Sequence, residues 1–408
     1  MLNPEQYRSN FPLLQSKIHL ANCSQAPLST ETLGALDRYK QTLLEDGMNW
    51  QAWMNEIELA KAEFAKLIGA SVEDISVMSS VSDTISAIAS CLPIYGRKRV
   101  VATVNEFPTV GHAWLARAQR GQIEVTFVEA PGGFYTEEVI EPHLRVASSG
   151  YEQSMSTQGH QIERQEDLAQ EQGVAILSVH QVSYYNAALQ NLRELADVAH
   201  RHGALLLVDA YQGLGTVPLD VRECGADIVV SGNLKYLLGV PGIAFMYVRH
   251  GLSEDLQPGM TGWFGRVNPF NFDATKLDFA PGARRFDMGT PPVMAGYIAR
   301  AGMQLIDKVG VANIYPHVQN LSQLVIEGAQ ARGLEVASPL DINKKGASTA
   351  IRVGPHSHAI ETELSRRNII VSARADVIRL APHFFTTASD IEIALDELAN
   401  VYKTMQKS

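Results

Sequence analysis

Asp209 and Lys235 are the two residues whose type and position first indicate chemistry. Asp209 directly follows the apolar run ALLLV, and Lys235 is the only charged residue in the stretch SGNLKYLLGVPG. Removing a charge from water is costly unless a partner compensates it, and it lowers the pKa of a lysine toward the nucleophilic amine. We expect the two residues to bind a ligand together. A helix-capping aspartate and a surface lysine are the structural alternatives.

Pyridoxal phosphate is a cofactor that would use both residues. It needs a lysine amine for its Schiff base, an acid facing its pyridine nitrogen, a flat group over its ring and donors around its phosphate. The stretch MSSVSDTISAIAS places hydroxyl and backbone N–H groups where a strand leads into a helix, and Val81 and Ser82 are best placed for the phosphate. Ordinary capping by Ser82 would explain that residue equally well. Phe107 would cover the ring or be part of the core.

Seven short apolar runs predict the strands that must position these residues. Each is continuous in Val, Ile, Leu or Phe, as is typical of strands buried on both faces. Helical patterns lie between them, which predicts an α/β sheet with crossover helices. Asp209 then falls at the carboxyl end of a strand, where open α/β sheets bind their ligands. The predicted strands are 75–78, 99–104, about 122–128, 175–179, 204–209, 227–230 and 243–248.

A second domain is indicated after about residue 290. There the pattern changes to the long helical stretch VMAGYIARAGMQLIDKVG, then to shorter strands and a terminal helix in DIEIALDELANVYKTM. We predict a large cofactor-binding domain over residues 15–285 and a smaller α+β domain from residues 1–14 and 286–408. The polar span 146–170 indicates an exposed insertion or lid.

Composition narrows the class of protein. The 408 residues are 46% hydrophobic and 19% charged with a net charge of -10, which favours a globular protein with a small-molecule ligand over a binder of nucleic acid or anionic membranes. No signal sequence and no run of 18 apolar residues is evident, so we expect a cytoplasmic protein. Cys23, Cys91 and Cys224 form no CxxC pair, and His356 and His358 lack a third ligand nearby, so no metal site is expected.

The chain resembles the class V aminotransferase superfamily of fold type I pyridoxal-phosphate enzymes, which holds cysteine desulfurases, selenocysteine lyases and kynureninases. The resemblance runs from about residue 17 to the end and is weakest at 130–170. It implies a fold type I transferase, with a seven-stranded, mostly parallel sheet in the large domain, and a homodimer. The motifs that carry it are IHLANCSQAPLS, SVSDTISA, EFPT, VSYYNA, VDAYQG, SGNLKYLLGVPGIAFMYV, GWFG, RRFDMGTPP and IRLAPHFF.

The resemblance assigns the cofactor-binding residues. It implies that Lys235 attaches the cofactor and moves protons at the substrate α carbon, while Asp209 pairs with the pyridine nitrogen. Gln212 would hydrogen-bond the phenolic oxygen, as in the desulfurases, and Phe107 would stack on the ring, as in the kynureninases. The phosphate would be bound by Val81 and Ser82, helped by Ser231 or the backbone beside it, with Thr290 reaching the phosphate of a neighbouring subunit.

The resemblance also assigns the substrate side. Arg379 matches the arginine that binds the substrate α-carboxylate, a role that its planar fork of five donors suits. The structural alternative is a strand arginine paired with Asp376. Tyr184 and Trp263 are expected to line the substrate pocket.

Two departures from the family pattern shape the expected reaction. No cysteine follows Cys224, whereas desulfurases carry a sulfur-accepting cysteine on a late loop. Leu234 and Thr290 stand where kynureninases have tyrosine and asparagine. We therefore predict a lyase or hydrolase that cleaves a β carbon–sulfur or carbon–carbon bond of an amino acid without a persulfide cysteine. The alternatives are a class V aminotransferase, an epimerase and a non-catalytic protein that keeps the cofactor pocket.

Overall fold

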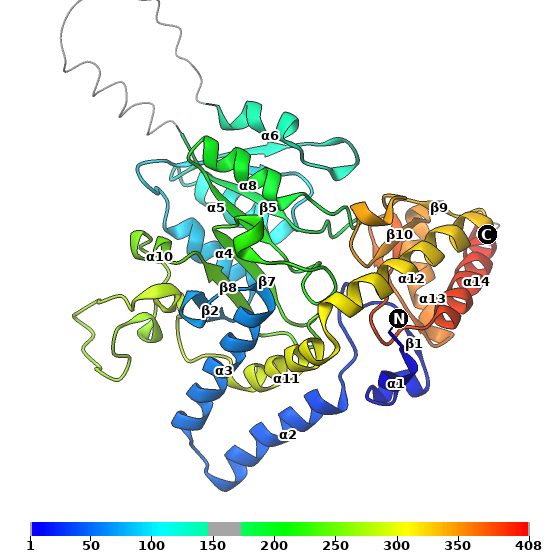
Figure 1. Ribbon diagram of the computed structural model, residues 1–408, viewed down its shortest axis with the longest axis horizontal. Coiled ribbons are helices and arrows are strands. Elements are labelled where there is room, and N and C mark those ends of the chain that lie inside the picture. The colour runs from blue at the N-terminus through cyan, green and yellow to red at the C-terminus, as the bar shows by residue number, and fades with distance from the viewer. Residues whose placement is uncertain (1, 146–172, 407–408) are drawn as a thin grey trace, which may run out of the picture.

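The computed structural model describes residues 2–145 and 173–406. A large sheet flanked by helices occupies one side of the molecule, and a smaller domain that carries both chain ends lies beside it (Figure 1). The polar span expected at 146–170 lies outside the described residues.

The described part of the large domain contains one sheet of seven strands, in the order β2-β8-β7-β6-β5-β3-β4. Strand β8 runs antiparallel to both of its neighbours, and the other pairs are parallel. The seven predicted strands and the α/β fold are thereby confirmed. The strands are β2 (Ile75–Met78), β3 (Arg99–Thr103), β4 (Glu124–Val128), β5 (Val174–His180), β6 (Leu205–Asp209), β7 (Ile228–Gly232) and β8 (Ala244–Val248).

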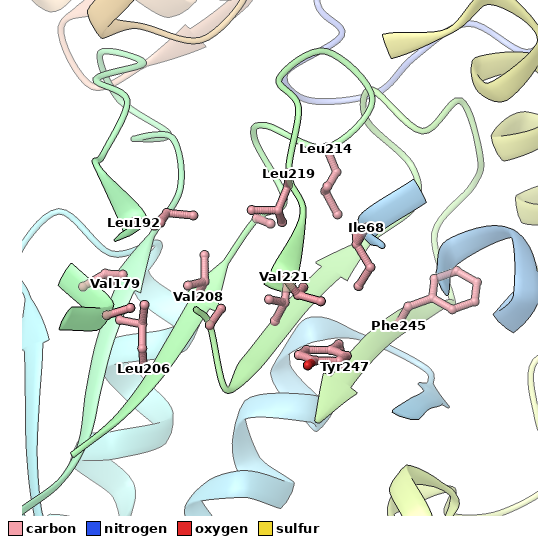
Figure 2. Packing of buried hydrophobic residues seen from close by; sticks show 14 of the residues in the cluster. Ile68, Val179, Leu192, Leu206, Val208, Leu214, Leu219, Val221, Phe245 and Tyr247 are labelled. Carbon is pink, nitrogen blue, oxygen red and sulfur yellow. The ribbon is translucent and has the colours of Figure 1, made fainter. Parts of the chain in front are cut away.

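Both faces of this sheet are buried, which explains why its strands are continuous apolar runs. In β6, Leu206 and Val208 pack into the hydrophobic cluster on one face, and Leu205 and Leu207 pack into the cluster on the other. Figure 2 shows the first cluster, with Leu206 and Val208 beside Val179. Fully burying one such side chain stabilises the folded state by roughly 1.5–3 kcal/mol. The sheet therefore holds the loops at its edge in fixed positions.

Helices cover the two faces unequally. Residues of α3 (Trp50–Ile68), α6 (Glu137–Leu144) and α8 (Leu192–Arg201) belong to the first cluster. Residues of α4 (Val81–Ser90) and α5 (Pro108–Ala118) belong to the second. Ser80, and not Ser82, caps α4 by accepting a hydrogen bond from the backbone N–H of Asp83 at 3.2 Å. The remaining helices of this domain are α2 (Thr30–Glu45), α9 (Val221–Cys224) and α10 (Leu252–Asp255).

The small domain is built on a four-stranded antiparallel sheet in the order β12-β13-β10-β9. Its strands are β9 (Glu335–Val336), β10 (Thr349–Arg352), β12 (Ser372–Arg374) and β13 (Val377–Leu380). Near the amino terminus, β1 (Ile18–His19) pairs in parallel with β11 (Ile369–Ile370), so the chain start is tied to this domain. The α-helices of the described chain that lie outside residues 15–285 are α1 (Glu5–Arg8), α11 (Val293–Val309), α12 (Val311–Ala331), α13 (Ser357–Arg366) and α14 (Ala388–Met405).

Helix α11 joins the two domains. Its Ala295 and Ala299 belong to the core of the large sheet, whereas its Leu305 and Ile306 pack in a cluster with Phe384. Because one helix contributes to both cores, the division at residues 285 and 286 stays a proposal.

A buried ion pair connects α3, β2 and the segment that leads to α11. Lys61, only 2% exposed, places its Nζ 2.7 Å from Oδ2 of Asp287. The other carboxylate oxygen of Asp287 accepts hydrogen bonds from Ser76 Oγ at 2.8 Å and from the backbone N–H of Val77 at 3.0 Å. Loss of this carboxylate would leave the lysine with only the half-exposed Glu58, 3.2 Å away.

We expect Asp287→Ala to lower the free energy of unfolding by about 3 kcal/mol, because it leaves a buried ammonium without its main partner. Urea unfolding followed by circular dichroism measures the change. The matched control is Asp307→Ala, which breaks an equally short ion pair with Lys66 that is exposed to solvent. The control should leave the unfolding curve almost unchanged. Similar curves for the two variants would contradict a structural role for the buried pair.

Candidate active site

A cavity of about 360 Å³ opens at the carboxyl edge of the large sheet. It is lined by the segments that follow β2, β3, β5, β6 and β7. Strand β8 is antiparallel and therefore begins at this edge, so the residues before it, Pro241, Gly242 and Ile243, also line the cavity. The small domain contributes Arg374 and Arg379. The cavity lies where open α/β sheets bind ligands.

Lys235 projects into this cavity among aromatic rings. Its Nζ lies 4.0 Å from the ring centroid of Tyr211 and 5.6 Å from that of Phe107. Gly232 makes room for Tyr211, because a Cβ at residue 232 would lie 2.1 Å from its Cζ. Burial lowers the pKa of Lys235 to about 8, although the negative charge of Asp209 opposes the shift. The free amine is therefore accessible near neutral pH.

A second buried lysine shows that a lowered pKa alone does not identify the site. Burial lowers the pKa of Lys345 to about 7. Its Nζ, however, donates to Ser322 Oγ, to Thr349 Oγ1 at 3.1 Å and to a backbone carbonyl. It does not line the cavity. Lys235 is distinguished by its position in the cavity.

Asp209 ends β6 and lines the cavity. Among the described residues its carboxylate accepts one hydrogen bond, from the backbone N–H of Tyr211 at 2.9 Å. Burial raises its pKa, and the Tyr211 N–H and Lys235 act in the opposite direction. A buried carboxylate with a single donor suits a ligand that brings its own positively charged N–H group. Gln212 lines the same wall and donates to the carbonyl of Cys23 at 3.1 Å.

Two buried titratable residues near Asp209 were not predicted, and one of them, His180, also lines the cavity. His180, at the end of β5, is paired in register with Asp209, and burial lowers its pKa to about 4. Thr103 Oγ1 lies 3.4 Å from both His180 Nδ1 and Glu106 Oε1. Burial, together with the nearby charge of Asp209, raises the pKa of Glu106 well above its usual range. His180 is therefore uncharged at neutral pH, and the charged form of Glu106 is disfavoured.

The amino-terminal end of α4 forms one side of the cavity. Val81 and Ser82 line it as predicted, together with Ser79, Ser80 and Thr109, which were not predicted. Ser82 Oγ lies 2.7 Å from Thr109 Oγ1. The backbone N–H groups of the first turn of a helix lack partners within the helix and favour an anion, so this cluster suits a phosphate.

The structure does not bring Ser231 or Thr290 to this cavity. Ser231 is buried in β7, where its hydroxyl donates to the carbonyl of Gly232 at 2.9 Å. Thr290 is exposed on the surface of the chain. The predicted role of Thr290 requires a second subunit.

Arg379 is fully buried at the side of the cavity that the small domain forms. The predicted alternative, a pair with Asp376, is wrong, because that carboxylate binds Arg352 and the hydroxyl of Tyr185. Nε of Arg379 has no hydrogen-bond partner, and no acid of the described chain pairs with this arginine. Its hydrogen-bond acceptors are all neutral: Tyr184 O at 2.7 Å, Ser372 Oγ at 2.6 Å and Ser24 Oγ at 3.0 Å.

Two of the three predicted aromatic residues lie in the cavity. Phe107 and Tyr184 both line it, with ring centroids 5.4 Å apart and nearly perpendicular planes. Trp263 does not line it. Its ring packs against Trp50 and Phe264 at centroid distances of 6.0 and 4.5 Å.

Cys23 and Arg374 are among the further lining residues that were not predicted. Cys23, which is buried, belongs to the motif IHLANCSQAPLS, whereas the family pattern places a sulfur-accepting cysteine on a late loop. Arg374 lies five residues before Arg379 and had no motif role. In the described chain, no group of three metal-ligating side chains is found and no helix is long and apolar enough to cross a membrane.

Comparison with known proteins agrees with this geometry. The family model for class-V aminotransferases matches residues 152–383. The chain is 36% identical to a Bacillus subtilis (strain 168) protein described as the uncharacterized aminotransferase YcbU, over 99% of both chains. It is 26% identical to a kynureninase of Deinococcus radiodurans, over 81% of this chain and 74% of that one.

The fold is also that of a solved enzyme. A variant of C-DES with glycine covalently linked to its pyridoxal-phosphate cofactor has a TM-score of 0.82 at 19% identity, over 96% of this chain and 99% of that one. The chain thus belongs to the class-V aminotransferase family and is a pyridoxal-phosphate-dependent enzyme.

Proposed function

We propose that this enzyme cleaves a β carbon–sulfur or carbon–carbon bond of an amino acid, as a lyase or hydrolase. The observation that carries the proposal is that Lys235, Asp209 and an arginine without an acidic partner line one cavity. The kynureninase relative supports bond cleavage. The 36% identical relative described as an aminotransferase supports the second candidate, which is transfer of the amino group to a keto acid.

The residues of the cavity fit the cofactor. Lys235 would hold it through its amine, Asp209 would face its pyridine nitrogen and Gln212 its phenolic oxygen. The start of α4, with Val81 and Ser82, would bind its phosphate. When bound, the cofactor supplies an electron sink for the substrate α carbon.

The side chains of the enzyme then position the substrate and move its proton. Arg379 would bind the α-carboxylate with its planar fork, since its present acceptors are neutral and its Nε is without a partner. The amine of Lys235, with a pKa of about 8, suits proton removal at the α carbon near neutral pH. Phe107 and Tyr184 would exclude water from the reacting atoms.

The charges around Lys235 give a test of its role. In cofactor-free protein, reductive methylation of Lys235 followed by peptide mass mapping should show a pH midpoint near 8. Asp209→Asn should move the midpoint lower, because it removes a negative charge that raises the pKa. Arg379→Gln should move it higher, because it removes a positive charge that lowers the pKa. A midpoint that does not move in either variant would contradict the proposed cluster.

The reaction type is tested by following the visible absorption of the holoenzyme with a panel of amino acids and no keto acid. We expect the original band to return while a cleavage product accumulates over many turnovers, because a lyase or hydrolase needs no second substrate. A single turnover that leaves the cofactor in its aminated form, with one equivalent of keto acid, would instead establish the aminotransferase.

The same reaction tests the expectation of a route without a persulfide cysteine. After turnover with cysteine, the mass of the peptide that contains Cys23 should be unchanged. A mass gain of one sulfur atom would make Cys23 a sulfur carrier and overturn that part of the proposal.

We also propose a homodimer with shared active sites. The support is a cluster of aromatic residues, Trp50, Trp263, Phe264, Phe270 and Phe272, in which Phe270 is 50% and Phe272 79% exposed. Exposed apolar patches of this kind mark protein interfaces. Thr290, later in the sequence than Phe272, is also exposed. A residue that contacts a neighbouring subunit would be exposed in the isolated chain.

We expect the double variant Phe270→Ser and Phe272→Ser to sediment as a monomer at concentrations where the parent is a dimer, because it removes the two most exposed rings of the cluster. Ile393→Ser, which changes a 47% exposed residue of α14, is the control and should sediment as the parent does. A dimer that persists in the double variant would place the interface elsewhere.

A further inference from the structure

Arg374 is a second arginine of the cavity to which the proposed function gives no role. It ends β12 and lines the cavity with Arg379. Its Nε is buried and lacks a hydrogen-bond partner. Among the described residues it forms no ion pair, although Arg352 of the same sheet is paired with both Glu335 and Asp376. Its guanidinium group is therefore available to a ligand.

The register of the small sheet places the two arginines on one face. Ser372 of β12 lies opposite Arg379 of β13, and Arg374 lies two residues further along β12. Because side chains alternate along a strand, Arg374 points to the same side as Ser372 and Arg379. Diagonal neighbours of this kind are about 7–8 Å apart. Two side chains at this spacing can bind the two ends of one small molecule.

The charges of the cavity leave one cation in excess on the substrate side. Asp209 is the only acid among the described lining residues, and it belongs to the cofactor side. The α-carboxylate of an amino acid needs only Arg379. A half-buried arginine beside an occupied site is costly without an anion, and its planar fork suits an oxyanion with two acceptors.

We propose that Arg374 binds a second oxyanion, carried by the side chain of the substrate. The substrate is then an amino acid with an acidic side chain, held at its α-carboxylate by Arg379 and at its far end by Arg374. This inference rests on the proposed function, because it takes the α-carboxylate to be bound at Arg379.

Calorimetric titration of the holoenzyme with succinate and butyrate tests the inference. The two acids have the same carbon chain, but only succinate has a second carboxylate, and neither has an amino group to react. The parent should bind succinate tighter than butyrate by roughly tenfold or more, as a charge-assisted contact allows. Arg374→Gln should remove this preference by weakening succinate alone. Arg374→Lys, which keeps the charge but not the fork, should restore part of it.

Arg379→Gln is the matched control and should weaken both acids. If Arg374→Gln weakened both acids equally, the two arginines would share one carboxylate and the inference would fail. It would also fail if Arg374→Gln changed neither acid, or if it weakened retention of the cofactor instead, because the arginine would then serve another group. If binding of both acids were independent of Arg379, the proposed function would fail instead.

Discussion

The site depends on an amine and a carboxylate that are both kept out of water at one edge of a sheet. Asp209 ends β6, and Lys235 lies in the segment that follows β7. These two strands are neighbours in the sheet and run parallel. Because both faces of these strands are buried, the strand ends cannot shift to bring either group into solvent. Burial lowers the pKa of Lys235 and raises that of Asp209, because both charged forms lose hydration. A ligand that pairs with these groups would offset this desolvation cost.

The arginines of the small-domain sheet differ in whether they have acidic partners. Arg352 is 41% exposed and has two acidic partners, which is an arrangement of ordinary surface charges. Arg379 is fully buried and is held in place by neutral oxygens, while Arg374 has no partner among the described residues. The acids of this sheet therefore compensate the arginine outside the cavity and leave the two inside it uncompensated. The two arginines of the cavity are therefore available to bind anions where the two domains meet.

The fold was predictable because its signal is local. Continuous apolar runs identify doubly buried strands without knowledge of their partners, and the lone charges Asp209 and Lys235 stand out within such runs. The capping residue was not predictable, because Ser79, Ser80 and Ser82 are chemically alike and only the backbone separates them. A pair between Asp376 and Arg379 looked plausible in sequence. It fails because Asp376 lies in the turn before β13 and is bound by Arg352.

Residues brought in by distant segments could not be predicted from any single stretch. Arg374 joins the cavity through the pairing of β12 with β13, and Cys23 joins it through the segment that follows β1. The periodicity of one stretch cannot predict a contact between segments that are far apart in the sequence. Trp263 and Thr290 stay predictions, because both lie outside the cavity of one chain and the predicted role of Thr290 requires a second subunit.

Two buried acids near the carboxyl edge of the sheet, Glu106 and Asp209, differ in their surroundings. Burial and the nearby charge of Asp209 raise the pKa of Glu106 well above its usual range. Asp209 has a backbone N–H donor and the nearby amine of Lys235, whereas Glu106 has only a long contact to the hydroxyl of Thr103. The charged form of Glu106 is therefore disfavoured, and neutral His180 adds no competing charge. Asp209 is the acid that lines the cavity, where its carboxylate would face a protonated pyridine nitrogen.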